Sequence, residues 1–379
     1  MRFTVNSTDL LKALTTVAGA VPSKATMPIL ECILFEASGE TLLLKATDLE
    51  ISIAERLAVR MEPQNGTLGA RRVAVPARRL LETLRALPDQ PVQFAADESF
   101  TVTLTTEQGH YKMVGFDGAD YPALPELEEA HTISIEAQLI RRAIQKTAFA
   151  VSKDALRPAM MGIFFQILPE EGRVVSTDGH RLVRFRLREL TYPKPLAFIV
   201  PEKATTLVAR LAAHADGSLT LRVGERHVAF DLGSARILSR LIDEVYPNYE
   251  AVIPLENDRR LTVDRNAFLA AVKRVGLYAS TTTNQVRLRL EKNHVEIAAE
   301  DIERASEAYE RIPCAYEGEP MVIGFNASYL TEVVGNVDSD EVVLEFSSPN
   351  RAGVVTPHDQ AEGEDLLMLI MPVMLNTYA

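Results

Sequence analysis

Apolar and polar positions alternate along this chain in one pattern that recurs three times, about every 125 residues. Each copy opens with two apolar residues spaced as in a β-strand, then a polar residue that could cap a helix, then an apolar helical face. The opening pairs are Phe3/Val5, Ile133/Ile135 and Leu261/Val263. A period this long allows each copy its own hydrophobic core. We therefore predict three domains, at residues 1–125, 126–255 and 256–379.

A weaker repeat lies inside each copy. When residues 73–84 are aligned with residues 3–14, their apolar positions coincide. The same strand-then-helix pattern returns near Val200 and Phe325. Alternating apolar runs follow each helix, and short loops between strands favour antiparallel pairing. The pattern predicts an α+β chain in which each domain contains two β-α-β-β-β units. The expected helices are 7–18, 77–87, 136–149, 202–213, 264–275 and 326–336, with linkers near 122–131 and 247–259.

The composition is that of an ordinary globular protein, with 379 residues, 47% of them hydrophobic and 24% charged. No apolar run approaches the roughly 20 residues that span a bilayer, so we expect no membrane association. The N-terminus lacks a signal-peptide core, which predicts a cytoplasmic location. Cys32 and Cys314 lie in different repeats, so neither a disulfide framework nor a zinc site is expected. We expect no cofactor.

The charge is unevenly distributed. The net charge is −12, yet the predicted helices carry twelve basic and six acidic residues, which leaves about −18 for the remainder. Lysine and arginine are good helix formers, so the excess could reflect solvated helix faces alone. Alternatively, the helices share a surface that meets a polyanion while acidic sheets face outward. The sixth predicted helix has no basic residue, which argues against a uniform version of the second interpretation.

Few features indicate catalysis. The phosphate-binding, dinucleotide-binding, zinc-protease and nucleophile-elbow motifs are all absent from the sequence. One cluster, Asp178 with His180 and Arg181, could serve acid–base chemistry because histidine titrates near neutral pH. However, Asp48 and Asp301 occupy corresponding places in the other copies, which favours a turn-capping role. A hydrolase that uses Asp178 and His180 remains an alternative.

Seven short motifs occur in order along the chain: 27–30 (MPIL), 47–50 (TDLE), 75–78 (VPAR), 177–182 (TDGHRL), 246–249 (YPNY), 324–329 (GFNASY) and 371–375 (MPVML). Together they resemble the bacterial DNA polymerase III β subunits, the sliding clamps, over essentially the full length. The resemblance implies a DNA clamp fold with helices lining the interior of a head-to-tail homodimeric ring and antiparallel sheets outside. It also implies a processivity factor for DNA replication that is not an enzyme and has no 3′–5′ exonuclease activity.

The same resemblance implies the partners. The ring would encircle duplex DNA without reading its sequence. It would tether the DNA polymerase III α subunit, the clamp loader, other polymerases and mismatch-repair proteins through short peptides. A monomeric repeat scaffold that binds only proteins remains a second alternative.

The resemblance also carries over candidate site residues. Those nearest the DNA would be Lys24, Arg78, Arg79, Lys153 and Lys203. A hydrophobic peptide groove between the second and third domains would comprise Met160, Thr177, Gly179, His180, Arg181, Leu182, Pro247, Val252, Asn326, Tyr329, Met371, Pro372, Val373 and Met374. The chain departs from the family at Ala251, where relatives often carry arginine, at Pro158 and Ala159, which replace an aromatic pair, and at residues 376–379, which extend past the usual end.

For the dimer interface, the resemblance pairs an edge strand that contains Tyr111, Lys112 and Met113 with a third-domain edge near Leu277 and Tyr278. The acidic residues near that edge in the sequence are Glu300, Asp301, Glu303 and Glu307. Relatives place several basic residues opposite such acids. Here only Lys112 and the titratable His110 are available, so we expect a more apolar interface.

Overall fold

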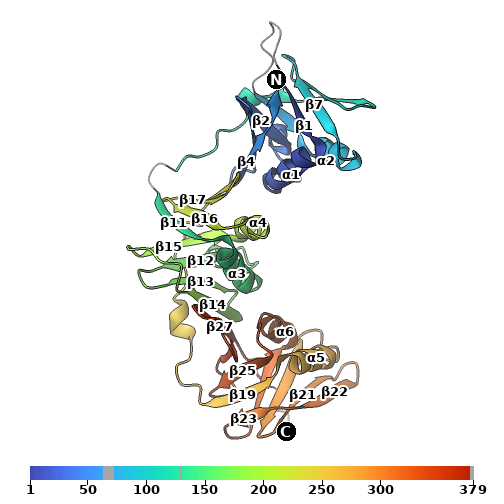
Figure 1. The fold of residues 1–379 in the computed structure, drawn as a ribbon. Helices are drawn as coiled ribbons and strands as arrows, with labels where there is room; N and C mark the ends of the chain where they lie inside the picture. The colour runs from blue at the N-terminus through green and yellow to red at the C-terminus, as the bar shows by residue number, and fades with distance from the viewer. Residues whose placement is uncertain (63–71, 128–129, 376–379) are drawn as a thin grey trace. The chain divides into compact units, whose positions relative to one another are not determined.

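The structure is a computed structural model that describes residues 1–62, 72–127 and 130–375 (Figure 1). The described residues pack into two compact bodies. The first comprises Met1–Arg141 and Lys203–Leu241, and the second comprises Arg142–Glu202 and Ile242–Ala379. Each body takes part of the middle third of the chain. The domain boundaries at 125/126 and 255/256 stay a prediction.

Six β-α-β-β-β units follow one another, as the apolar pattern predicts. The first three are β1 (Arg2–Asn6), α1 (Ser7–Val17), β2 (Cys32–Ser38), β3 (Thr41–Thr47), β4 (Ile51–Ala58); β6 (Arg72–Pro76), α2 (Ala77–Ala86), β7 (Pro91–Ala96), β8 (Thr101–Thr105), β9 (His110–Val114); and β11 (His131–Glu136), α3 (Ala137–Thr147), β12 (Gly162–Ile167), β13 (Gly172–Thr177), β14 (Arg181–Leu187).

The other three are β15 (Leu196–Pro201), α4 (Glu202–Ala212), β16 (Ser218–Val223), β17 (His227–Leu232), β18 (Ala235–Arg240); β19 (Arg259–Asp264), α5 (Arg265–Gly276), β20 (Gln285–Glu291), β21 (His294–Asp301), β22 (Ser306–Pro313); and β24 (Met321–Asn326), α6 (Ala327–Gly335), β25 (Glu341–Phe346), β26 (Gly353–Pro357), β27 (Glu364–Ile370). Three short strands, β5 (Arg60–Met61), β10 (Phe116–Asp117) and β23 (Ala315–Glu317), extend the sheets.

Local sequence explains where the helices begin. The side chains of Asn6, Asp264 and Asn326 accept hydrogen bonds from backbone N–H groups in the first turns of α1, α5 and α6. These caps satisfy donors that have no partner inside the helix. The polar cap predicted at the opening of each copy is confirmed at Asn6 and Asp264. No helix in the described part of the chain is long and apolar enough to cross a membrane.

Paired units exchange their first strands. β1 pairs with β7 of the second unit while β6 pairs with β2 of the first, and the same exchange joins β11 to β16, β15 to β12, β19 to β25 and β24 to β20. All of these pairs are antiparallel. Each unit therefore completes the sheet of its neighbour, and neither unit of a pair retains its own first strand.

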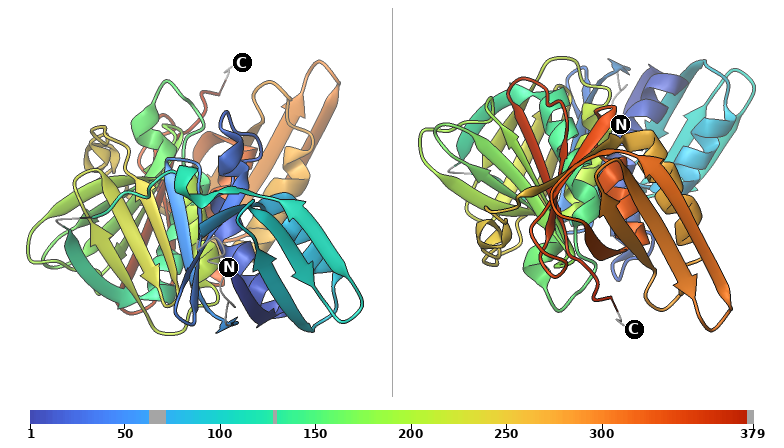
Figure 2. Two further views of the ribbon diagram at one scale, coloured as in Figure 1. Left: turned by 90° about the horizontal axis from the view of Figure 1, so that it is seen from above. Right: turned by 90° about the horizontal axis from the view of Figure 1, so that it is seen from below.

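The helices cover one face of the sheets. In the first body α1 and α2 lie side by side, and in the second body α5 and α6 do the same (Figures 1 and 2). Leu10, Leu14 and Val17 of α1 are buried, as their helical spacing requires. Beneath them the rings of Phe3, Phe94 and Phe35 stack in turn, with centroids 4.7 and 5.0 Å apart.

The last strands of the units join one sheet to another. β4 pairs with β18 in the first body and β14 with β27 in the second, which creates two nine-stranded sheets. The remaining last strands, β9 and β22, lie at the ends of a five-stranded and a four-stranded sheet. Within the described residues, β9 and β22 are therefore paired along one side only.

Candidate functional site

The turn at residues 177–182 is held together by its own side chains. The Thr177 hydroxyl donates to the Arg181 carbonyl at 2.7 Å and accepts from Gly179 N at 3.1 Å. The Asp178 carboxylate accepts from the backbone N–H groups of His180 and Arg181 at 2.9 and 3.0 Å. Asp178 thus caps a turn, which is the structural role that its repetition in the sequence favoured.

The first copy contains the same turn. Thr47 Oγ1 donates to the Ile51 carbonyl at 3.0 Å, and Asp48 accepts from the backbone N–H groups of Glu50 and Ile51 at 3.1 and 2.7 Å. The turn requires a positive φ, which is +78° at Leu49 and +89° at Gly179. Glycine adopts this conformation without a steric penalty. The recurrence confirms the turn-capping interpretation of the aspartate.

Arg181 is a structural tie. Its side chain is 9% exposed, and its guanidinium contacts Asp178 at 3.2 Å, the Phe149 carbonyl at 2.8 Å and the Glu332 carboxylate on α6. It also lies over the ring of Tyr329, 4.8 Å from the centroid. These contacts hold Nε, Nη1 and Nη2 of Arg181 within the chain, and its predicted place in a peptide groove stays a prediction. Its neighbour His180 is exposed and stacks on Tyr329 at 5.5 Å.

The C-terminal segment forms one side of this region. Met371 N donates to the His180 carbonyl at 2.8 Å, and Val373 forms an antiparallel bridge with Gly324 through a 2.8 Å hydrogen bond. The Met371 and Met374 side chains are 43% and 80% exposed. The segment therefore presents two flexible apolar side chains to solvent beside the turn. Residues 376–379, the predicted extension, lie outside the described residues.

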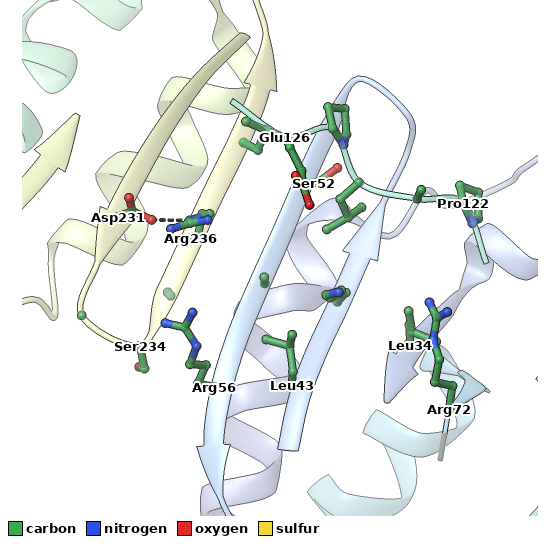
Figure 3. Close-up of a pocket in the computed structure, with 18 residues that line it drawn as sticks. Leu34, Leu43, Ser52, Arg56, Arg72, Pro122, Glu126, Asp231, Ser234 and Arg236 are labelled. Atoms are coloured by element: carbon green, nitrogen blue, oxygen red, sulfur yellow. Dashed lines mark hydrogen bonds and ion pairs between the residues drawn. The ribbon is translucent and has the colours of Figure 1, made fainter. Parts of the chain in front are cut away.

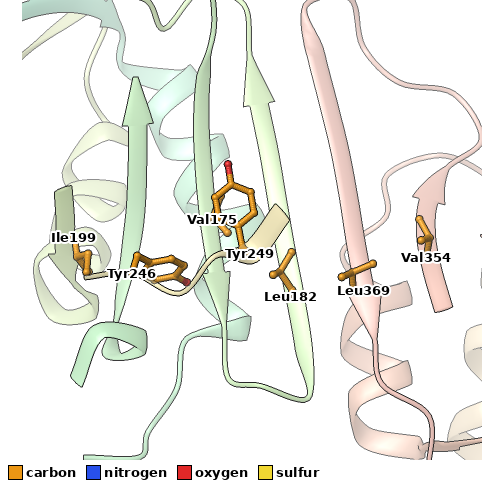
Figure 4. Close-up of a cluster of buried hydrophobic side chains, with 7 residues drawn as sticks. All are labelled: Val175, Leu182, Ile199, Tyr246, Tyr249, Val354 and Leu369. Carbon is orange, nitrogen blue, oxygen red and sulfur yellow. The ribbon is translucent and has the colours of Figure 1, made fainter. Parts of the chain in front are cut away.

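Apolar side chains gather on the outer face of the adjoining nine-stranded sheet, which is the face opposite α3. Phe185 points to the α3 side, where Arg142 lies over its ring, so the alternate residues of β14 point outward. The outward cluster, seen in Figure 4, contains Val175, Leu182, Ile199, Tyr246, Tyr249, Val354 and Leu369. Sequence reasoning assigned only Leu182 of this set to the groove.

The segment before the third repeat folds over this cluster. Tyr246 stacks on Phe164 with ring centroids 4.6 Å apart, and Tyr249 meets the same ring edge-on at 6.2 Å. Burial raises the pKa of both tyrosines, which stay neutral. Beyond them Val252 is 56% exposed at the end of a short 3₁₀ turn, Tyr249–Val252. Alternation in the strands was a usable signal for Phe164 and Leu369, whereas the overlying tyrosines were noted in the sequence only as part of the motif 246–249.

The other predicted groove residues also lie in the second body. Met160 is half-buried in a 3₁₀ turn, Pro158–Met161, while Pro247 and Pro372 are half-buried in their segments. The side-chain oxygen of Asn326 accepts from Ser328 N and Tyr329 N, and the predicted contact of Asn326 with a peptide stays a prediction. That oxygen caps α6.

The predicted DNA-facing residues are exposed, but three of them have partners. Arg78 pairs with Glu82 at 3.0 Å, Lys153 pairs with Glu202 and Lys203 pairs with Asp48. Such exposed pairs contribute little and exchange readily. Lys24 and Arg79 are exposed as well.

Two basic residues counted in the helical charge excess are structural. Lys146 is buried and contacts Asp338 at 2.5 Å and the Asn336 carbonyl at 2.6 Å. Arg142 pairs with Glu364 at 2.7 Å and with Asp338 at 2.8 Å. The two side chains tie α3 to elements of the last repeat. The positive charge free to meet a polyanion is therefore smaller than the sequence count implies.

The two edge strands carry exposed apolar side chains. Tyr111 and Val114 on β9 are 38% and 68% exposed, and Tyr309 on β22 is 70% exposed. Leu277 and Tyr278, which follow α5 directly, are 82% and 46% exposed. Lys112 is exposed on β9.

Two residues of the predicted interface serve their own subunit. Met113 is buried opposite Val102, so it belongs to the core of its own sheet. Asp301 is buried and accepts from Arg304 N at 3.2 Å, which caps a turn. Glu303 lies in that turn, whereas Glu300 and Glu307 stand directly opposite each other on β21 and β22. Like charges in this arrangement are destabilising unless a cation lies near them.

The first body contains a cavity of about 380 Å³ beneath the linker 122–126 (Figure 3). Tyr121 anchors the linker, because its hydroxyl donates to the Cys32 carbonyl at 3.3 Å and accepts from Thr47 N at 3.2 Å. Lys45 and Arg72 share Glu36, and Arg236 pairs with Asp231. Because most of these charges are neutralised internally, we assign no ligand to this cavity. No group of three potential metal ligands occurs among the described residues.

Comparison with known proteins identifies relatives along the whole chain. Family models of the DNA polymerase III beta subunit match in turn: the N-terminal domain at residues 1–125, the central domain at 134–248 and the C-terminal domain at 250–374. The beta sliding clamp of Pseudomonas putida is 30% identical over 377 residues, covering 99% of this chain and all of the relative. That of Caulobacter vibrioides is 31% identical over 360 residues, covering 92% and 94%.

Solved structures agree. The sliding clamp from Pseudomonas aeruginosa bound to griselimycin has a TM-score of 0.93 at 29% identity, covering 99% of this chain and all of that one. The clamp from Bartonella birtlesii bound to griselimycin has a TM-score of 0.90 at 30% identity, with the same coverage. The similarity therefore extends over the fold as well as the sequence.

Proposed function

The chain belongs to the DNA polymerase III beta subunit family, and from that premise we propose that two copies close head to tail into a ring around duplex DNA. Members of this family are sliding clamps, which are non-catalytic processivity factors, so the chain has a role in DNA replication. The clamp binds DNA and polymerase. Neither the hydrolase nor the monomeric scaffold is supported. The cytoplasm, where bacterial DNA is replicated, is the location that we propose.

One observation supports the ring: two of the last strands, β9 and β22, lie at sheet edges. The other last strands pair with each other, β4 with β18 and β14 with β27. By the same rule β9 of one copy would pair with β22 of a second. Each copy offers one strand of each kind, so the contact is heterologous and repeats until a ring closes. Unpaired edges invite uncontrolled association, and closure would remove both.

Weak electrostatics support a clamp that slides. B-DNA carries one negative charge per ~1.7 Å of axis, which lysine and arginine attract without reading sequence. Lys153 and Lys203 already have carboxylate partners within the chain. A phosphate would therefore replace an existing pair and gain little, which keeps each contact short-lived. We propose Lys24, Arg78, Arg79, Lys153 and Lys203 as residues that meet DNA in this way.

We propose that the polymerase, the clamp loader and repair proteins dock in a groove on the second body. Its apolar side chains are Leu182, Leu369, Val252 and the exposed Met371 and Met374. His180 and Tyr329 stack beside it. An extended peptide with apolar anchors matches this surface, because methionine side chains adapt to different partners.

The ring is tested by retention on DNA. The protein is loaded onto a nicked circular plasmid with a clamp loader, and half of the sample is then linearised. A topological link predicts retention on the circle and loss from the linear form. Native mass measurement should give a dimer of the 41.9 kDa chain. Equal retention on both DNA forms, or a stable monomer, contradicts the ring.

A further inference from the structure

Arg184 is a charged residue in an otherwise apolar row on the outer face of the second body's nine-stranded sheet. Val175 and Leu367 stand directly opposite it on the two neighbouring strands. Phe164 and Ile199 continue the row across β12 and β15. A guanidinium is costly in such surroundings unless its donors find acceptors.

The row runs through the buried apolar cluster, since Val175 and Ile199 belong to both. Leu182 lies two residues before Arg184 on β14 and therefore points to the same face. Leu369 stands opposite Leu182, and Val354 stands opposite Leu369. Val175, Leu182, Val354 and Leu369 all belong to the cluster in Figure 4. A peptide with side chains on Leu182 would therefore bring its next residues within reach of Arg184.

The donors of Arg184 are largely unused. Its Nη2 donates to Asp365 Oδ1 at 3.4 Å, which is long for a hydrogen bond, and its Nε is buried without an acceptor among the described residues. Asp365 lies nearer to Arg186, at 3.1 Å. By contrast, Arg173 and Arg186 each contact Glu171 at 2.7 Å. Arg184 is thus the under-partnered arginine of the three.

We propose that Arg184 binds a carboxylate that the docking peptide carries next to its apolar anchors; this inference rests on the proposed peptide groove. The guanidinium fork can hold both carboxylate oxygens, and its side chain is only 15% exposed, so solvent screens the pair weakly. Asp365 is the acid that competes for the same donors. The groove would therefore select acidic apolar peptides over neutral ones of the same shape.

The test measures anisotropy of labelled peptides from the polymerase α subunit on the full-length clamp. For each polar position beside the apolar anchors, a peptide with Asp there is compared with one that has Asn. Each peptide is prepared with an amidated and with a free C-terminus, which separates the effect of a side-chain carboxylate from that of a terminal one. We expect one Asp peptide, or the free-carboxylate peptide, to bind about tenfold more tightly than its neutral match. Arg184→Met should remove this preference while leaving neutral-peptide affinity within about twofold, since the apolar anchors remain.

Arg186→Met is the matched control, because Arg186 lies on the same strand and face but already has two acidic partners. It should keep the preference, and Arg184→Lys should retain part of it through charge alone. Equal affinity for acidic and neutral peptides in the unmodified protein, or equal loss in both Met variants, overturns the inference while leaving the groove intact. Absence of binding by every peptide refutes the groove, and the inference with it.

Discussion

Glu171 is a buried carboxylate placed between two arginines. Arg173 and Arg186 each approach it at 2.7 Å, and its side chain is 11% exposed. Burial alone would raise the pKa of Glu171, but hydrogen bonds from Arg186 and Arg173 outweigh it, so the pKa lies below its ordinary value of 4.5. A lowered pKa means that the interaction stabilises the fold fully above pH 4.5 and less as pH falls through the folded-state pKa.

We predict that Glu171→Gln lowers the free energy of unfolding at pH 7 by about 1–3 kcal/mol, because two guanidinium groups lose a charged acceptor. The same variant should lose less stability than the unmodified protein between pH 4.5 and pH 3. Urea denaturation at several pH values measures both effects. Glu170→Gln, an exposed neighbour, is the control and should change neither. A Glu171→Gln deficit that persists unchanged at pH 3 would contradict the assignment.

At the scale of elements, the short C-terminal segment forms one wall of the proposed peptide groove. Residues 371–375 follow β27 and are held by the hydrogen bonds of Met371 to His180 and of Val373 to Gly324. Apart from the single bridge of Val373 to Gly324 at the edge of β24, the strand pairings described for the six units do not involve these residues. Their removal should therefore affect ligands more than folding.

Deleting residues 371–379 should abolish binding of a clamp-binding peptide while the ring and its DNA retention persist. Without this wall the apolar anchors of the peptide stay partly in water. The binding free energy then falls by several kcal/mol, on the order of 25 cal/mol for each Å² of apolar surface that is not buried. Fluorescence anisotropy measures the affinity. Deleting only 376–379 is the control, and it should leave affinity unchanged because the wall remains. Unchanged affinity in the longer deletion would exclude this groove.

At the scale of the whole molecule, assembly should depend on apolar contacts at the edges. Leu277 and Tyr278 are exposed within one chain, so their truncation removes little packing from the subunit itself. If a partner buries them, each contributes roughly 1.5–3 kcal/mol. Only Lys112 is a permanent cation on β9, so screening by salt should matter little.

The double variant Leu277→Ala/Tyr278→Ala should weaken dimerisation by a hundredfold or more, which corresponds to about 3–6 kcal/mol. Sedimentation at sub-micromolar concentration, in low and high salt, measures this. Leu156→Ala removes a side chain that is 90% exposed and belongs to neither edge strand, and this variant should dimerise normally. A double variant that sediments as the unmodified dimer would show that the interface lies elsewhere.

Hydrophobic periodicity by itself determined the six units, their helices and their antiparallel strands, because a strand of period two and a helix of period 3.6 leave local signatures. The Thr-Asp turn was readable as well, since Asp48 and Asp178 repeat at matching places. Asn6 and Asp264 were recognisable caps for the same reason, whereas Asn326 was expected to contact a peptide. Each of these features depends on residues that are close along the chain.

Tertiary structure decided which strands exchange between units, which edges remain open and which charges are free. From the sequence, Met113 was expected at the dimer interface and Lys146 on an exposed helix face. Both are buried, because burial depends on strand partners and helices far along the chain. Arg181 likewise became a tie to α6 through Glu332, 151 residues away. The row that contains Arg184 is assembled across five strands. No sequence window contains such neighbours, because side-chain environment is set by packing at long range.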